Sequence, residues 1–142
     1  MLVGLSQRNI RNHFAGGALA FGIVLVGLQL IGLILPLLSQ DIYNQVDAAI
    51  YIVHVVGGIF GGYLVERRVE GNYLRTGIVI AVLAYIFEYT YRWIVLGFST
   101  DSFALVSLLT GGIIGSVLNG WRKKNFSKAV KSTGLKSHFC AI

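Results

Sequence analysis

Three ionisable side chains lie inside stretches that are otherwise apolar. Glu88 and Arg92 are one helical turn apart in the stretch 74–97, and His54 lies in the stretch 48–65. An ionised side chain at membrane depth costs roughly 2.5–3.5 kcal/mol on insertion scales, so it usually faces a partner or a water-filled cavity. A carboxylate, a guanidinium and an imidazole together can form a buried clasp between helices, relay protons or ions, or contact polar groups of a larger assembly. The residue types leave these three readings open.

Polar side chains of the apolar stretches lie at similar depths. Most of them are five to nine residues inward from the predicted outer ends of their stretches, which places them within about one helical turn of a common level. Two tyrosines join them because they share a helical face with the glutamate. The sequence therefore predicts one intramembrane polar network made of Glu88, Arg92, His54, Gln29, Tyr85, Tyr89 and Ser107.

Recognisable catalytic and metal-binding motifs are missing from the sequence. It contains no glycine-rich phosphate loop, HExxH, nucleophile elbow or CxxC, and it has one cysteine. One histidine and one glutamate at membrane depth are too few ligands for a metal site. The net charge is +6, but no aromatic and basic platform for nucleic acid accompanies it. We expect no enzyme, no metal, no cofactor and no nucleic-acid partner.

Four apolar stretches dominate the chain. Of its 142 residues 55% are hydrophobic and 13% are charged, whereas a soluble domain carries about 25% charged residues. The stretches cover residues 14–38, 48–65, 74–97 and 102–120, each close to the roughly 20 residues that cross a bilayer. The sequence predicts a single all-α integral membrane domain, residues 1–142, with a basic tail over 121–142.

Basic residues and short connections predict the topology. Neighbouring stretches must run antiparallel, as two hairpins, because the connections between them are short. Eleven of the 12 Lys and Arg residues fall on one side, and the two connections on the other side contain none. The positive-inside rule therefore predicts that both termini are cytoplasmic and that the chain lies in the cell membrane. The basic side chains that best carry this topology signal and contact anionic lipid headgroups are Arg67, Arg68, Arg122, Lys123 and Lys124.

The basic tail has two interpretations. Phe126 and Val130 would lie on one face of a short interfacial helix, and the alternative is a disordered polybasic segment. In either form the tail would contact anionic lipids on the cytoplasmic side of the membrane.

Glycines recur at a fixed offset of 54 residues. Asp47 matches Asp101, and each is followed after nine residues by a Gly-Gly-x-x-Gly pattern. Small residues four apart allow helix backbones to approach closely in a bilayer. We expect a parallel internal repeat of two hairpins. The helix-packing residues, whether inside the bundle or between copies, are Gly57, Gly58, Gly61, Gly62, Gly111, Gly112 and Gly115.

The segment 56–65 reads Val-Gly-Gly-Ile-Phe-Gly-Gly-Tyr-Leu-Val and is followed by a short basic turn and by Gly77. This pattern resembles small glycine-rich four-helix membrane proteins of archaea and Gram-positive bacteria, whose function is unknown. The resemblance implies an architecture and leaves activity open. Glu88 and Arg92 depart from the pattern.

Two functions remain as expectations. The first is a structural or accessory subunit that assembles through its glycine-rich helix faces with itself or with a larger membrane complex. The second is a small transporter or channel-like protein that passes protons or small solutes past His54 and Glu88.

Overall fold

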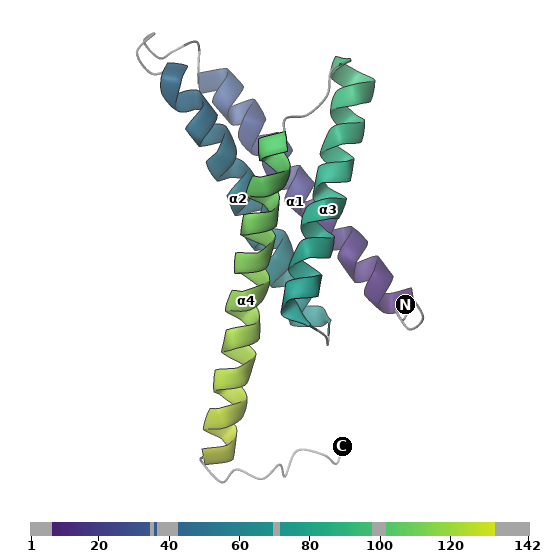
Figure 1. Ribbon diagram of the computed structural model, residues 1–142, viewed down its shortest axis with the longest axis vertical. Helices are drawn as coiled ribbons and strands as arrows, with labels where there is room; N and C mark the ends of the chain where they lie inside the picture. Colours follow the sequence, from purple (N-terminus) through teal and green to yellow (C-terminus); the bar gives the residue numbers. More distant parts are fainter. Residues whose placement is uncertain (1–6, 35, 37–42, 70–71, 98–101, 133–142) are drawn as a thin grey trace.

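The computed structural model describes residues 7–34, 36, 43–69, 72–97 and 102–132. The secondary structure in this part of the chain is helical throughout (Figure 1). The helices are α1 (Gln7–Ile34), α2 (Tyr43–Arg68), α3 (Tyr73–Tyr91) with the π-helical turn η3 (Arg92–Leu96), and α4 (Ser102–Ser132). The structure confirms the predicted all-α fold, and its four α-helices are long and apolar enough to cross a membrane.

Three helices extend well beyond their predicted spans. α1 begins seven residues before position 14, and α2 begins five residues before position 48 and ends three residues after position 65. α4 continues twelve residues past position 120, into the predicted basic tail. Segment 121–132 contains Lys, Arg and Ala residues and no proline, so it favours continuation of the helix. The remaining tail residues, 133–142, lie outside the described part of the chain.

Local sequence signals explain several helix ends. α1 ends at Ile34, two residues before Pro36, because proline disfavours helical conformation in the residue before it. The side chain of Asn72 accepts a hydrogen bond from the Leu74 backbone N–H at 3.1 Å and caps the start of α3. Gly97 ends η3 with φ of 71°, a left-handed conformation that a residue without a Cβ adopts easily.

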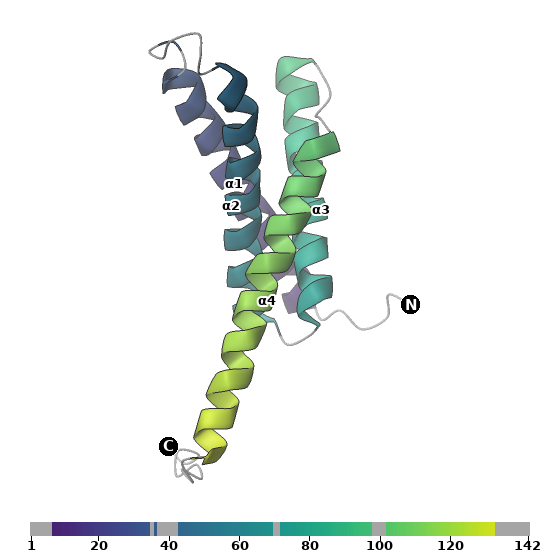
Figure 2. The same cartoon turned by 60° about the vertical axis from the view of Figure 1, so that its left-hand side comes forward.

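The four α-helices form an elongated bundle. In Figure 1 the first turns of α1 lie near the lower ends of α2 and α3, and the last turns of α4 lie below them. The end of α3 and the start of α4 lie toward the upper end. α2 contacts all three other helices, and α3 also packs against α1 and α4. Figure 1 shows α2 and α3 diverging toward the upper end, and both views show α4 running well past the lower ends of its neighbours (Figures 1 and 2).

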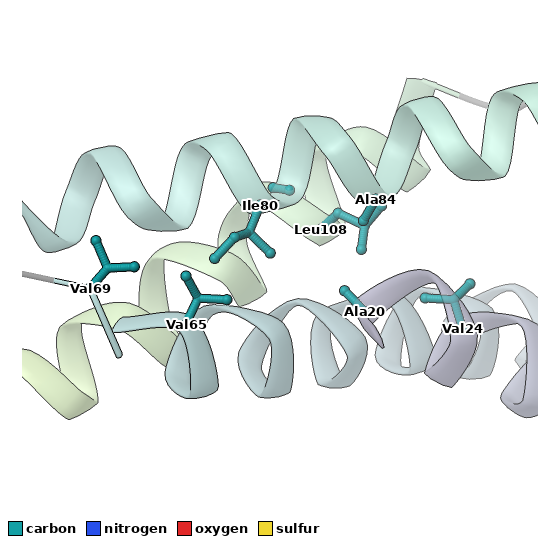
Figure 3. Close-up of a cluster of buried hydrophobic side chains, with 8 residues drawn as sticks. Ala20, Val24, Val65, Val69, Ile80, Ala84 and Leu108 are labelled. Carbon is teal, nitrogen blue, oxygen red and sulfur yellow. The ribbon is translucent and has the colours of Figure 1, made fainter. Parts of the chain in front are cut away.

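The core is apolar and built largely from small side chains. Figure 3 shows it gathered where the helices meet. Leu108, Ile80 and Ala84 have no exposed surface, and Val24 is 1% exposed. The full cluster consists of Ala20, Val24, Val65, Val69, Ile80, Ala81, Ala84 and Leu108. Such short side chains bring the helix axes close together, which favours packing in a bilayer.

The predicted glycines lie inside this bundle, on two adjacent faces of α2 and on the facing side of α4. A Cβ built on Gly58 would lie 2.7 Å from the Leu108 backbone oxygen, so α2 and α4 touch there by backbone. A Cβ on Gly57 would lie 2.8 Å from the Ala20 backbone oxygen of α1. Comparable close approaches to neighbouring helices occur at Gly61, Gly62, Gly111, Gly112 and Gly115. The seven glycines therefore serve packing within the chain.

Large apolar side chains cover the outside of the bundle. Exposed examples occur on every helix, including Leu33 (71%), Ile52 (62%) and Phe103 (62%). An apolar exterior of this extent is unfavourable in water and is matched by lipid tails.

Candidate functional site

α2 and α3 each contribute a buried titratable side chain to one contact. The Nε2 atom of His54 lies 3.1 Å from both carboxylate oxygens of Glu88. His54 has no exposed surface and Glu88 is 2% exposed. The Nδ1 atom of His54 lies 2.7 Å from the Ile50 backbone oxygen, one turn earlier on α2. Because a carbonyl oxygen only accepts, Nδ1 carries a hydrogen and donates it there.

This tautomer requires one further proton at the contact. If Glu88 is a carboxylate, Nε2 of His54 must also carry a hydrogen and donate it. If Nε2 is bare, Glu88 must be a neutral acid that donates to it. Both forms contain the same number of protons, so the His54–Glu88 pair is neutral in each.

Arg92 completes a three-residue cluster with these two side chains. Its Nη2 atom lies 2.8 Å from Oε1 of Glu88, and its side chain is 20% exposed. The spacing of four residues on α3 brings the two groups together. With the shared proton in place, the His54–Glu88–Arg92 cluster carries one net positive charge.

The π-helical turn η3 begins at Arg92, the residue that supplies the guanidinium of this cluster. The backbone N–H of Arg92 is directed to the carbonyl oxygens of both Glu88 and Tyr89. A single π-helical turn inside a helix is uncommon and is often found at functional sites. The sequence analysis had not predicted it, because no residue type marks a π turn reliably.

A cavity of about 280 Å³ opens between α1 and α3 beside the cluster. Gln29 of α1 lines it together with Glu88 and Arg92, so the structure brings this predicted residue to the site. His54 is not among the lining residues. The remaining wall is Phe21, Val24, Leu25, Leu28 and Tyr91.

Three other predicted network residues lie apart from the cluster. The hydroxyl of Ser107 donates to the Phe103 backbone oxygen of its own helix at 2.9 Å. Tyr85 and Tyr89 pack their rings together with centroids 6.4 Å apart, and Tyr89 is 45% exposed. The polar network therefore contains fewer residues than the similar depth of these side chains predicted.

Basic side chains predicted to face lipid headgroups divide into two groups. Arg67 and Arg68 are exposed at the end of α2. Arg122 instead donates to the Tyr63 hydroxyl at 2.8 Å, and Lys124 lies 5.6 Å from the centroid of the Tyr73 ring. These α4 side chains fasten the lower part of α4 to α2 and α3.

Lys123 is also part of this fastening. Its ammonium group donates to the backbone oxygen of Glu66, and it lies 3.4 Å from the backbone oxygen of Val69. Both oxygens are at the end of α2, where helix carbonyls lack partners within the helix. Lys123, a residue of α4, therefore caps the C-terminal end of α2.

Glu66 is a buried carboxylate that the sequence analysis missed. It is 3% exposed, its Oε1 lies 3.8 Å from the Lys123 ammonium, and its Oε2 has no hydrogen-bond partner among the described residues. A signal was available: His54, Gly58, Gly62 and Glu66 follow one another at intervals of four, on one face of α2. The neighbouring Arg67 and Arg68 made Glu66 look like part of an exposed turn.

Among the helices and turns that the structure describes, no group of three His, Cys, Asp or Glu side chains could hold a metal ion. Comparisons with protein-family models, with curated proteins and with solved structures found no match. The resemblance to small glycine-rich membrane proteins therefore stays a prediction.

Proposed function

We propose that this chain is an integral protein of the cell membrane that acts as a structural or accessory subunit. In this proposal the helices cross the bilayer as two antiparallel hairpins, arisen by duplication, with both termini in the cytoplasm. The asymmetric distribution of Lys and Arg supports this orientation. Its partners are the lipid bilayer and either a second copy or a larger membrane complex.

The observation that carries the structural function is the closure of the His54–Glu88–Arg92 cluster. The carboxyl group of Glu88 contacts Arg92 at 2.8 Å and His54 at 3.1 Å, and both ring nitrogens of His54 make a hydrogen bond. A buried ionic group that is fully hydrogen-bonded fixes how two helices are rotated and staggered. The cluster therefore acts as a clasp between α2 and α3.

Assembly with other chains requires a surface other than the seven predicted glycines, because internal packing occupies them. α1 retains such a surface. A Cβ built on Gly22 or on Gly32 would meet nothing within 4 Å, so neither glycine is used by the bundle. Gly22 also lines an apolar groove between α1 and α2, which supports contact with a transmembrane helix of another subunit.

Native mass spectrometry after gentle extraction from the membrane tests this function. The structural proposal expects the chain in a complex of fixed stoichiometry, with itself or with other subunits. Replacing Gly22 by Phe should dissociate that complex, whereas Phe at Leu33, another exposed position of α1, should not. A lone monomer in every preparation would contradict the assembly function.

A second candidate, passage of protons or small solutes, is favoured by the cavity that reaches Glu88 and Arg92. A protein with this function would show proton flux in liposomes that carry an internal pH indicator, and Glu88→Gln would abolish the flux. The structural proposal expects the same leak rate with wild-type protein, with Glu88→Gln and with empty liposomes.

A further inference from the structure

The cavity between α1 and α3 has a polarity gradient along its length. On α1 its lining residues follow one helical face: Phe21 and Leu25 lie deeper, and Gln29 lies at the outer end. Arg92 on the opposite wall lies four residues before the end of η3, about 6 Å from that end along a helix. The α1 wall of the slot is therefore apolar at depth and polar toward the membrane surface, and on the opposite wall Arg92 lies one turn farther out than Glu88.

The outer end of the slot is suited to an anion. The ion pair with Glu88 uses one of the five N–H donors of Arg92, and the guanidinium also lines the slot. Gln29 adds an amide that can donate. Glu88 lines the slot one turn deeper, but its charge is matched by Arg92 at 2.8 Å and by the shared proton of His54, so the cluster keeps one net positive charge.

The size of the slot restricts what can enter its apolar part. Its volume of about 280 Å³ is just below the roughly 300–1,000 Å³ that small-molecule pockets span. The rings of Phe21 and Tyr91, with centroids 5.8 Å apart, narrow it further. A slender hydrocarbon chain fits this shape better than a compact polar solute.

We propose that the slot between α1 and α3 binds one acyl chain of an anionic phospholipid, whose phosphate is held by Arg92 and Gln29. The chain lies along Leu25 and Leu28, in the direction that the polarity of the slot requires. Arginine favours this ligand because its planar group pairs with phosphate oxygens. The inference rests on the proposed placement of the helices in a bilayer.

Competition between two lipids tests the proposal. The purified full-length protein is offered equal amounts of phosphatidylglycerol and phosphatidylcholine with identical acyl chains, and native mass spectrometry counts the lipids retained. The test variant Leu25→Trp fills the slot. The matched control is Leu33→Trp, which places the same side chain on α1 at a position that is 71% exposed and outside the slot.

The wild type and Leu33→Trp should retain phosphatidylglycerol over phosphatidylcholine by roughly tenfold, the ratio that one charge-assisted hydrogen bond supplies. Leu25→Trp should lower that ratio at least threefold. The basic residues that follow the fourth span bind anionic lipid equally in all three proteins, so the difference between the two tryptophan variants reports the slot. Equal ratios in those variants, or no preference in the wild type, would overturn the proposal.

Gln29→Leu provides a second variant in case the indole disturbs the fold. It removes a polar group from the outer end of the slot and leaves the apolar part open. We expect a smaller loss of preference, with the lipid count otherwise unchanged. A failure of these lipid results with an intact complex in the extraction experiment would reject the lipid site and leave the structural function standing.

Discussion

His54 on α2 and Glu88 on α3 are 34 positions apart in the sequence, yet the histidine Nε2 lies 3.1 Å from both carboxylate oxygens of the glutamate. Both side chains are almost completely removed from the surface. The contact links two helices by a polar interaction in an interior that is otherwise filled by alanine, glycine and aliphatic side chains. It is therefore a directional contact between α2 and α3, which aliphatic packing alone does not supply.

The two buried glutamates should respond differently to the same substitution. Glu88→Gln leaves Arg92 without its charged partner and should destabilise the protein by about 3 kcal/mol, as expected for breaking a buried pair. Glu66→Gln removes a carboxylate with one oxygen unpartnered among the described residues, so it should cost less than about 1 kcal/mol. Unfolding in detergent measures both. Equal losses would show that burial of the carboxylates, rather than their pairing, determines their importance.

Gly58→Ala should loosen the contact between α2 and α4. The added Cβ would lie 2.7 Å from a backbone oxygen, so the helices must separate, at a cost of about 1–3 kcal/mol. Gly22→Ala is the matched control, since a Cβ there meets nothing within 4 Å, and it should stabilise α1 by about 0.5–1 kcal/mol. Unfolding curves of the two variants should therefore shift in opposite directions. The curves are compared for monomeric protein in detergent, where a loss of stability in both variants would contradict the open space found at Gly22 within the chain.

The proposed orientation can be tested with the single cysteine of the chain, Cys140. A maleimide that does not cross membranes should leave Cys140 unlabelled in intact cells and label it after permeabilisation. A protein with Cys140→Ser and Ser102→Cys moves the thiol to the start of α4, on the opposite side, and should be labelled in intact cells. The reverse pattern would place the basic residues outside.

Much of the architecture could be predicted because lipid imposes simple rules on a sequence. The four apolar stretches predicted four helices, and the structure confirms that all four are long enough to cross a membrane. The one-turn spacing of Glu88 and Arg92 predicted that they could pair, and the similar depth of His54 predicted that it could reach them. These relations depend on helical geometry alone.

The parts that could not be predicted depend on tertiary packing. Two faces of α2 carry glycines, and nothing in the sequence says which face meets α1 and which meets α4. Lys123 was interpreted as a headgroup contact because its role as a cap for α2 exists only once α4 lies beside that helix end. The same holds for Ser107, whose hydroxyl donates to the Phe103 backbone oxygen of its own helix and does not reach the cluster.

The most direct test of the central claim is a double-mutant cycle on His54 and Glu88, because their contact joins α2 to α3. If they form a coupled structural clasp, the double variant His54→Ala with Glu88→Ala should lose about 1–3 kcal/mol less stability than the sum of the two single losses. Ordinary hydrogen bonds between membrane helices average about 0.6 kcal/mol, so a coupling above about 1 kcal/mol indicates a charge pair. Additive losses in the unfolding free energies of the single and double variants would contradict the clasp.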